Sequence, residues 1–457
     1  MFKRIIIFLL VLQFCLATTI ADARNITLQN HYVDGKNVLI QEVLTQENMT
    51  YIINRHFDLA GAVIILPEGS VLEFKKRGSL SNGILIGKNS SVKSSADKVI
   101  FSNLTVLGEW NVVDIYSKWF QFGDDPEINA RNFRSMCMLT DDYHQGIIHI
   151  SEGVYKIKLD EKNQFCFGLN SNTELILHGN VMLEPNDLED YQMVQVKNKN
   201  NVKIHGSGSL IGDVETHTGI KGEWGMGVEI LSSDNVQVKD LTIKNCWGDC
   251  VYIGQSEYKR ESYSRNVIID NVICQAGRRQ GLSIIAGQNI YVNKCKLIDT
   301  GLIKFTAPGA GIDIEPNLQG KTIVDNVVID SCIFYGNKDN KDFMTYNLDS
   351  TSNIYLKNCQ MEGNILLGKN SYNIIVDSCD IREIISNEDL LDNIIIKNST
   401  IQKRIKNSIN RNNIKFENCK QVEPSVMSLR IVIPFGGLMV LSAFGIKNVY
   451  QKHNKSA

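Results

Sequence analysis

A short alternation of apolar and polar residues recurs at a fixed step along the C-terminal half of the chain. The phrases NIYLKNCQM, NIIVDSCDI, NIIIKNSTI and NIKFENCKQ begin at Asn353, Asn373, Asn393 and Asn413. Looser copies of this phrase begin at Asn201, Asn235, Asn266, Asn289 and Asn326. A period near 20 residues, with one strand-like phrase per copy, indicates a β-solenoid and is too short for a two-helix repeat.

Each phrase predicts two short strands joined by a tight corner. Ile374 and Val376 alternate with outward residues, so they face one side of a strand. Asp377 and Ser378 form a corner, where short polar side chains tolerate left-handed backbone, and Cys379 begins the second strand. A third strand follows in CVYIG, GLSII, GIDIE and GNILL. The sequence therefore predicts an all-β fold, a single-stranded parallel β-helix with three strands per coil, right-handed by the general preference of parallel crossovers.

The chain divides into four predicted regions. They are a signal peptide (1–23), an N-terminal β-rich module (24–118), the β-helix with a capping helix at about 126–139 (119–421), and a C-terminal tail (422–457). The module is either an early part of the solenoid or a small separate unit. The helix starts favourably, because aspartates precede its first proline. We expect it to cover the open end of the solenoid core.

Both ends of the chain carry apolar segments that bear on localisation. Lys3 and Arg4 precede an apolar run and an A-x-A site, which predicts a cleaved signal peptide and a secreted, periplasmic or cell-surface protein. A lipoprotein anchored at Cys15 is the weaker alternative. Residues 431–446 are apolar but short for a membrane helix, so they form either a strand pair closing the last coil or a C-terminal membrane anchor. Membrane contact is expected only through this tail.

Composition narrows the classes of partner and cofactor. The formal net charge is −2, which gives no positive field for nucleic acid. Successive phrases place a cysteine at the same position, and we expect mostly free, buried thiols there, with disulfides as the alternative. These cysteines are Cys295, Cys332, Cys359, Cys379 and Cys419. No Cys-x-x-Cys pair with metal spacing occurs, so neither a metal site nor a cofactor is predicted.

Candidate chemistry gathers on the third strands of the middle coils. Alternation there predicts one column of side chains facing solvent, made of Glu229, Tyr252, Ser283 and Asp313. A rim where the strands begin is predicted to hold Asp249, Arg278, Arg279 and Gln280. Trp224 lies on the segment entering the Glu229 strand. The longest insertions, between residues 212 and 320, surround this strip, and insertions in a solenoid often mark its binding face.

These residue types suit a polysaccharide. Aromatic rings stack on sugars, arginines hold anionic groups with forked hydrogen bonds, and carboxylates transfer protons. Asp313 and Glu315 would lie about 6.8 Å apart on one side of a strand, within the spacing that glycoside hydrolysis needs. The same acids also fit a solvated surface or calcium ligands, and the arginines fit simple ion pairs with nearby acids.

The segment from Gly248 to Glu315 resembles a known family. The coils look like the pectin-lyase-like superfamily, and GDCVYIG and GRRQGLSI resemble the double-aspartate and glycine-histidine-glycine motifs of the polygalacturonase family of glycoside hydrolases. The resemblance carries over Asp249 alone as a catalytic acid. Gly248 replaces the second aspartate, Gln280 replaces the histidine, and GAGIDIE lies where that family has an arginine and a lysine. RRQGLSI with GIDIEPN also resembles uncharacterised secreted β-helix proteins of polysaccharide-degrading bacteria.

Three functions follow as hypotheses. The first is a glycoside hydrolase in which Asp249 and either Asp313 or Glu315 are acid and base, with Glu229 in reserve. Its substrate would be bound by Trp224, Tyr252, Arg278, Arg279, Gln280 and Ser283. The second is a polysaccharide lyase acting on a uronate polymer, for which calcium is an optional cofactor. The third is a non-catalytic glycan-binding or adhesin solenoid, because a shared architecture does not determine activity.

Overall fold

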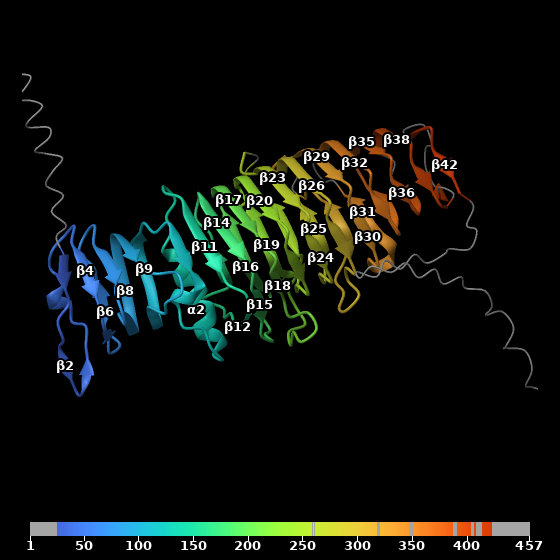
Figure 1. Ribbon diagram of the computed structural model, residues 1–457. Helices are drawn as coiled ribbons and strands as arrows, with labels where there is room; N and C mark the ends of the chain where they lie inside the picture. Colours follow the sequence, from blue (N-terminus) through green and yellow to red (C-terminus); the bar gives the residue numbers. More distant parts are fainter. Residues whose placement is uncertain are drawn as a thin grey trace, which may run out of the picture.

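The computed structural model is an elongated stack of β-coils, which runs from β4 at one end to β42 at the other (Figure 1). It describes residues 25–257, 259, 261–317, 320–346, 351–386, 391–403, 406–407 and 414–422. The predicted signal peptide and the apolar segment 431–446 lie outside these residues. Among the described residues no helix is both long and apolar enough to cross a membrane.

Three parallel sheets form the walls of the main β-helix. The first sheet contains, in spatial order, β10 (Asp114–Tyr116), β11 (Gly146–Ile150), β14 (Thr173–Leu177), β17 (Asn200–His205), β20 (Asp234–Lys239), β23 (Ser264–Asp270), β26 (Gly287–Asn293), β29 (Val324–Asp330), β32 (Thr351–Lys357), β35 (Ser371–Asp377), β38 (Leu391–Lys397) and β41 (Ile414–Glu417). The second contains β12 (Val154–Ile157), β15 (Asn180–Leu183), β18 (Ser209–Ile211), β21 (Thr242–Lys244), β24 (Ile273–Gln275), β27 (Lys296–Ile298), β30 (Ile333–Tyr335), β33 (Gln360–Met361), β36 (Asp380–Ile381), β39 (Thr400–Ile401) and β42 (Lys420–Gln421).

The third sheet carries the predicted site. Its strands are β13 (Phe165–Gly168), β16 (Asp190–Lys197), β19 (Trp224–Leu231), β22 (Val251–Gly254), β25 (Gln280–Ile284), β28 (Ala310–Ile314), β31 (Lys341–Thr345), β34 (Asn364–Leu367), β37 (Glu383–Ser386) and β40 (Lys406–Asn407). Short 3-10 turns occur at η1 (Gln41–Val43), η2 (Ser117–Trp119) and η3 (Lys338–Asn340). Each coil contributes one strand to each sheet, so the predicted parallel β-helix with three strands per coil is confirmed.

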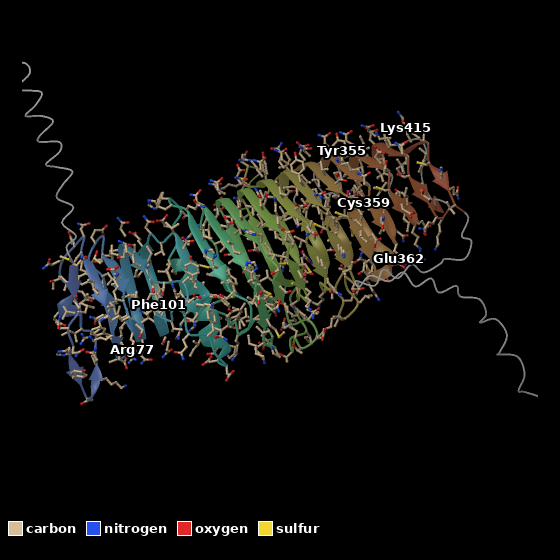
Figure 2. All side chains as sticks on the ribbon, in the orientation of Figure 1. Arg77, Phe101, Tyr355, Cys359, Glu362 and Lys415 are labelled. Atoms are coloured by element: carbon tan, nitrogen blue, oxygen red, sulfur yellow. The ribbon has the colours of Figure 1, made fainter. Side chains whose placement is uncertain are left out.

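The strand register reproduces the period of the sequence. Ile354 pairs with Ile374, which pairs with Ile394, a step of one phrase per coil. These isoleucines are fully buried, so they form part of the long, narrow core. The neighbouring positions face outward, in a column that includes Tyr355 and Lys415 (Figure 2). The alternation predicted for the phrase is therefore present in the first sheet.

Asparagines stabilise the coils in two ways. The predicted left-handed corner is present at Ser378, with φ 55°, and at Asn398, with φ 51°. The asparagines that open the phrases are left-handed too, with φ 51° at both Asn373 and Asn393. Their side chains also bond from coil to coil, since Asn393 Nδ2 donates to Asn373 Oδ1 at 2.7 Å. The recurring asparagine therefore serves both the turn and the stacking of coils.

The N-terminal strands are also stacked in parallel. Thr50 of β4 (Thr50–Ile53) pairs with Val71 of β7 (Val71–Phe74), and Val71 pairs with Ser91 of β8 (Ser79–Lys93). The sheet also includes β1 (Asn25–Thr27), β5 (His56–Asp58), β6 (Val63–Ile65) and β9 (Phe101–Trp110). A small antiparallel hairpin, β2 (Tyr32–Val33) with β3 (Lys36–Asn37), projects from it. The strands of this N-terminal module therefore stack in parallel, as the strands of the main β-helix do.

One α-helix, α2 (Pro126–Met138), is present among the described residues, near the predicted position. The Asp125 side chain caps it by accepting hydrogen bonds from the amides of Glu127 and Ile128 at 2.9 and 3.1 Å. Its buried face packs against β9, β12 and β13, where the Phe133 and Phe167 rings lie 4.6 Å apart. The helix therefore covers the core where the three-sheet coils begin, between them and the N-terminal strands.

The cysteines of the described residues are all free. Those of the repeating phrase lie buried beside the turn after each first-sheet strand, except Cys419, which is half-buried. Cys359 is one of them and is shown in Figure 2. Free thiols were the favoured expectation, and no disulfide closes the coils within the described part of the chain.

Candidate functional site

The predicted column exists in the third sheet. Glu229 pairs with Tyr252, Tyr252 with Ser283, and Ser283 with Asp313, one residue from each of four successive coils. Parallel strands lie about 4.8 Å apart, so neighbouring members of the column are within side-chain reach of one another. Register alone therefore brings together residues that are more than 80 positions apart in the sequence, as from Glu229 to Asp313.

The prediction that this column faces solvent is wrong for its polar members, because Glu229, Ser283 and Asp313 are all buried, the last two with 1% exposure. Asp249 and Gln280 of the predicted rim are buried as well. The reason is that the long insertions fold back over the rim. Arg278 Nη1 donates to the carbonyl of Gly222 at 2.7 Å, and the amide of Thr306 donates to the carbonyl of Arg278 at 3.2 Å. A periodic pattern shows which way a side chain points, but not whether a loop covers it.

Arg279 and Asp249 form the centre of the site. Arg279 Nε donates to Asp249 Oδ1 at 2.7 Å, and Nη2 donates to Oδ2 at 2.5 Å. Ser283 Oγ donates to the same Oδ2 at 2.7 Å. Burial alone would lower the pKa of Arg279. The charge of Asp249 and its hydrogen bonds with the guanidinium have the larger combined effect, so the pKa of Arg279 is raised. Asp249, the one acid that the family resemblance carried over, is thus engaged in a buried ion pair.

Asp313 lies in a different environment from Asp249. Gln280 Nε2 donates to Asp313 Oδ2 at 2.8 Å, and Gln280 Oε1 accepts from the amide of Ala310 at 2.8 Å. Asp313 Oδ1 is buried and has no hydrogen-bond partner among the described residues. Burial raises the pKa of Asp313 well above its usual range, Glu315 raises it further, and Arg279 opposes the shift. Burial therefore favours the protonated form of this carboxyl group more than in a free aspartate.

Glu315 and Glu223 are the accessible acids of the cluster. Glu315 follows β28 directly and is half-buried. Burial raises its pKa, Arg279 lowers it, and Asp249 and Glu223 raise it again. Glu223 lies 4.0 Å from Arg279 Nη1, and its side chain is 40% exposed. One guanidinium is thus surrounded by several carboxyl groups, which keeps the edge of the site acidic.

Two aromatic rings border the Arg279 guanidinium. The rings of Trp224 and Tyr252 lie 6.0 Å apart, edge to face. The guanidinium carbon lies 5.0 Å from the Trp224 ring centroid and 5.9 Å from that of Tyr252. Trp224 remains 41% exposed, so part of its ring is available to a ligand. Both aromatic residues predicted from the sequence therefore belong to the site.

Glu229 and Arg278 lie in other surroundings. Glu229 accepts a hydrogen bond from Gln195 Nε2 at 2.9 Å, on the side away from Asp313, and burial raises its pKa. Arg278 stacks on Trp247, with its guanidinium carbon 3.7 Å from the ring centroid. Its hydrogen bonds go to the backbone carbonyls of Gly222 and Trp247. Arg278 therefore contacts the segment that leads to Trp224.

Sequence analysis missed the network behind this segment. His217 Nδ1 lies 2.9 Å from Asp213 Oδ2, and both side chains are fully buried. The His217 ring stacks on Trp247 with centroids 3.6 Å apart, and Tyr191 bonds both Asp213 and the Trp247 amide. The available signal was the i, i+4 spacing of aspartate and histidine in the first long insertion. The described residues include no group of three or more His, Cys, Asp or Glu side chains placed to hold a metal ion.

Fold and site together define the class: a parallel β-helix with a buried arginine–carboxyl cluster on its third sheet. No family model matches the chain. It is 31% identical over 180 residues to the uncharacterized protein YclG of Bacillus subtilis (strain 168), covering 36% of this chain and 31% of that protein. It is 26% identical over 215 residues to the SPbeta prophage-derived uncharacterized protein YorA of the same strain, covering 42% and 36%. The chain thus spans about a third of the length of these curated relatives.

Solved structures that resemble the chain include enzymes and adhesins. The A-module of mannuronan C-5 epimerase AlgE4 from Azotobacter vinelandii has 12% identity and a TM-score of 0.48, covering 68% of this chain and 96% of that one. An exopolygalacturonase from Thermotoga maritima has 15% identity and a TM-score of 0.36, covering 61% and 84%. The adhesin PfbA of Streptococcus pneumoniae has 13% identity and a TM-score of 0.37, covering 82% and 90%. The assignment of the fold rests on the strand pairing of the chain itself.

Proposed function

We propose that this protein is a secreted, carbohydrate-active enzyme that hydrolyses glycosidic bonds with Asp313 as general acid and Glu315 as general base or nucleophile. The observation that supports this most is the environment of Asp313, a buried carboxyl with a raised pKa whose Oδ1 has no partner in the described part of the chain. A general acid must hold its proton at the working pH, and burial is one common way to achieve this.

The two carboxyl groups are two residues apart, with Asp313 in β28 and Glu315 directly after it. Residues i and i+2 of a strand are about 6.8 Å apart, a spacing within the range of known glycosidase pairs. Asp313 would donate its proton to the glycosidic oxygen as the bond to the anomeric carbon breaks. Glu315, which is half-exposed, would then activate a water molecule or attack the anomeric carbon.

Asp249 has a supporting role in this proposal. Its oxygens are bonded to Arg279 and Ser283, so it holds the guanidinium in place and is poorly placed to transfer protons. Arg279 in turn lies between Trp224 and Tyr252, and it fixes the wall against which a sugar ring would stack. The earlier expectation that Asp249 itself is the acid or base is replaced by this positioning role.

The charge distribution favours an uncharged glycan. Arg279 is bonded to Asp249, and Arg278 is bonded to backbone carbonyls. Neither arginine is therefore free to hold a uronate carboxylate, as a lyase would require. Glu223 and Glu315 add negative charge at the accessible edge.

A second candidate, a non-catalytic glycan-binding solenoid, is favoured by the deep burial of Asp249 and Asp313.

A product assay on a panel of neutral and acidic polysaccharides tests the proposal. We expect new reducing ends from a neutral glycan and no unsaturated product. Glu315→Gln and Asp313→Asn should each lower turnover by about 10²–10⁴-fold. The matched control is Glu362→Gln, an exposed acid on a later coil (Figure 2), which should retain full activity. Binding without cleavage would support the solenoid that only binds glycans, and an unsaturated product would indicate a lyase.

A further inference from the structure

Two hollows lie side by side on the N-terminal strands, away from the Arg279 cluster. The first, of about 390 Å³, is lined by Asn30, Tyr32, Asn37, Asn54, Arg55, His56 and Lys76. The second, of about 410 Å³, is lined by Glu73, Phe74, Lys75, Lys76, Lys93, Ser94, Ser95 and Lys98. Lys76 lines both, so the two hollows are adjacent at this side chain.

The lining of the hollows is strongly cationic. Arginine and lysine supply five of the lining residues, and Glu73 is the one acid among them. Lys75 lies 2.5 Å from Glu73 Oε1 and neutralises it. Within the described part of the chain, Lys76, Lys93 and Lys98 form no salt bridge. An excess of unpaired positive charge therefore faces a concave surface, although the chain as a whole has a net charge of −2.

The second hollow also has polar atoms that lack partners. Lys98 Nζ and Ser94 Oγ are both buried and make no hydrogen bond to any described residue. Burial without a partner lowers the pKa of Lys98, because the ammonium has lost water and gained no counter-charge. Unpaired buried donors are costly to a fold and are uncommon. Neither of these donors has a counter-charge or acceptor among the described residues.

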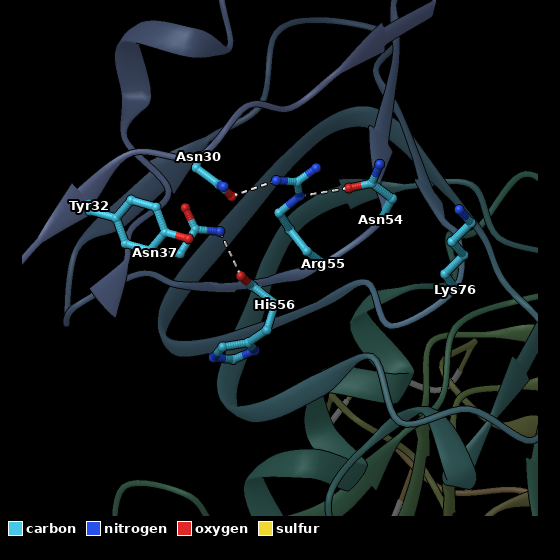
Figure 3. A pocket seen from close by; sticks show the side chains of 7 residues that line it. All are labelled: Asn30, Tyr32, Asn37, Asn54, Arg55, His56 and Lys76. Atoms are coloured by element: carbon cyan, nitrogen blue, oxygen red, sulfur yellow. Dashed lines mark hydrogen bonds between the residues drawn. The ribbon is translucent and has the colours of Figure 1, made fainter. Parts of the chain in front are cut away.

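The first hollow provides groups that suit sugars (Figure 3). Arg55 is held in place by two amides, since its Nη1 donates to Asn30 Oδ1 at 2.8 Å and its Nε donates to Asn54 Oδ1 at 2.9 Å. Asn37 Nδ2 donates to the carbonyl of His56 at 2.8 Å. Tyr32 is 65% exposed, and its ring can stack on a pyranose. Amides and an aromatic ring beside cations match a hydroxylated ligand with acidic groups.

Lys76 lies where the two hollows meet, and its backbone conformation is unusual. It has φ 47°, in the left-handed region that most side chains avoid. Elsewhere this chain fills left-handed positions mainly with asparagine. A lysine at this turn carries an exposed ammonium to the point where the two hollows meet.

We propose that the N-terminal strands form a second carbohydrate-binding site, which binds an acidic polysaccharide, with carboxylate or sulfate groups on its sugars, across both hollows. The lysines around Lys76 and Lys98 pair with the acidic groups, and the amides and Tyr32 contact the hydroxyl groups and ring faces. This site is separate from the proposed catalytic cluster. It would hold the enzyme on an acidic matrix while the cluster acts on another glycan.

The test measures binding of the full-length protein to immobilised polygalacturonate and dextran sulfate, with dextran and single-stranded DNA as comparison ligands. We expect binding to both acidic glycans, which added salt weakens. The double variant Lys76→Ala/Lys93→Ala should lose about tenfold or more in affinity. Lys98→Met, which keeps the aliphatic stem, should lose affinity as well. The control Lys88→Ala removes an exposed lysine outside both hollows and should bind as the wild type does.

Three results would overturn the proposal. They are equal binding of dextran, unchanged affinity in the Lys76/Lys93 and Lys98 variants, and DNA binding as tight as that of polygalacturonate, which would indicate attraction to any polyanion. Melting temperatures of the variants show whether the fold is retained; Lys76 and Lys93 are exposed, so we expect it to be. Because these variants leave the Arg279 cluster intact, failure here is distinguishable from failure of the proposed hydrolase.

Discussion

Arg279 and Asp249 form a bidentate ion pair between two neighbouring coils, and Asp249 is entirely buried. Their N–O distances are 2.7 and 2.5 Å. The guanidinium also lies near Glu223, Asp313 and Glu315, so its charge influences every carboxyl group of the site. The ion pair therefore links the stability of the coil stack to the chemistry proposed for it.

Removing one partner of this pair should destabilise the protein strongly. Asp249→Ala leaves the Arg279 charge buried and unpaired, which costs about 3–5 kcal/mol of the free energy of unfolding. Urea unfolding followed by circular dichroism measures the change. The matched double variant Asp249→Leu/Arg279→Met removes both charges and should recover most of the lost stability. A single variant as stable as the wild type would contradict the buried pairing.

The raised pKa of Asp313 predicts a direction for the dependence of stability on pH. An unfolded aspartate releases its proton near pH 4, but the folded chain keeps it to higher pH. The folded state is therefore favoured below about pH 4, and this contribution is lost as the pH rises towards the raised pKa. Asp313→Asn cannot ionise, so the variant should lose less stability than the wild type as the pH rises above about pH 4. Urea unfolding at several pH values checks this.

An acid of the first sheet provides the opposite control. The Asn398 side chain lowers the pKa of Asp377 by donating to its Oδ1 at 2.9 Å. The contribution of the Asp377 carboxylate to folding stability is therefore present at neutral pH and is lost as the pH falls through the lowered pKa. Asp377→Asn should cost stability near pH 7 and make little difference in strong acid. If both aspartate variants shifted the pH profile in the same direction, the raised pKa of Asp313 would be wrong.

Trp224 should contribute to substrate binding more than to the fold. Its ring is 41% exposed and borders the Arg279 guanidinium. Trp224→Ala removes a stacking surface worth about 0.5–1.5 kcal/mol, so KM should rise up to about tenfold. Steady-state kinetics on the substrate found in the polysaccharide panel measures this. Trp224→Phe keeps a ring and should recover most of the affinity, whereas an unchanged KM in the alanine variant would place the substrate elsewhere.

The phrase-opening asparagines should tolerate glycine better than alanine. Asn393 has φ 51° and donates a hydrogen bond to Asn373 at 2.7 Å. Alanine loses this bond and also strains the left-handed backbone, at a cost of about 1–2 kcal/mol for the backbone alone. Asn393→Gly loses the bond without that strain. Urea unfolding of the two variants should therefore rank glycine as the more stable, and the reverse order would contradict the role of the turn.

Much of the architecture was predictable because a solenoid repeats the same sequence pattern in each coil. The step from Asn353 to Asn373 gave the coil length, and alternation around Ile374 gave the inward face. The same reasoning placed Glu229, Tyr252, Ser283 and Asp313 in one column, since register transfers from one coil to the next. Local patterns suffice wherever each residue contacts the equivalent residue of its neighbour.

The environment of the site was less predictable, since it depends on segments that do not repeat. The insertion that carries Gly222 and Trp224 has no period, so its return over the rim has no signature in the sequence. The pairing of Arg279 with Asp249 joins side chains 30 positions apart, and Arg278, its neighbour in the chain, turns to Trp247. The sequence does not distinguish the arginine that pairs with Asp249 from the arginine that stacks on Trp247.

The step from Ile354 to Ile374 equals the step from Ile374 to Ile394, so the register does not fix how many coils the C-terminal part of the β-helix contains. Excising one whole phrase, residues 374–393, would bring Ile394 against Ile354 in the same register, with like side chains meeting like. Evolution can therefore extend or shorten this protein in units of one coil without redesigning its interior, while the coils that carry Asp313 and Arg279 are left as they are.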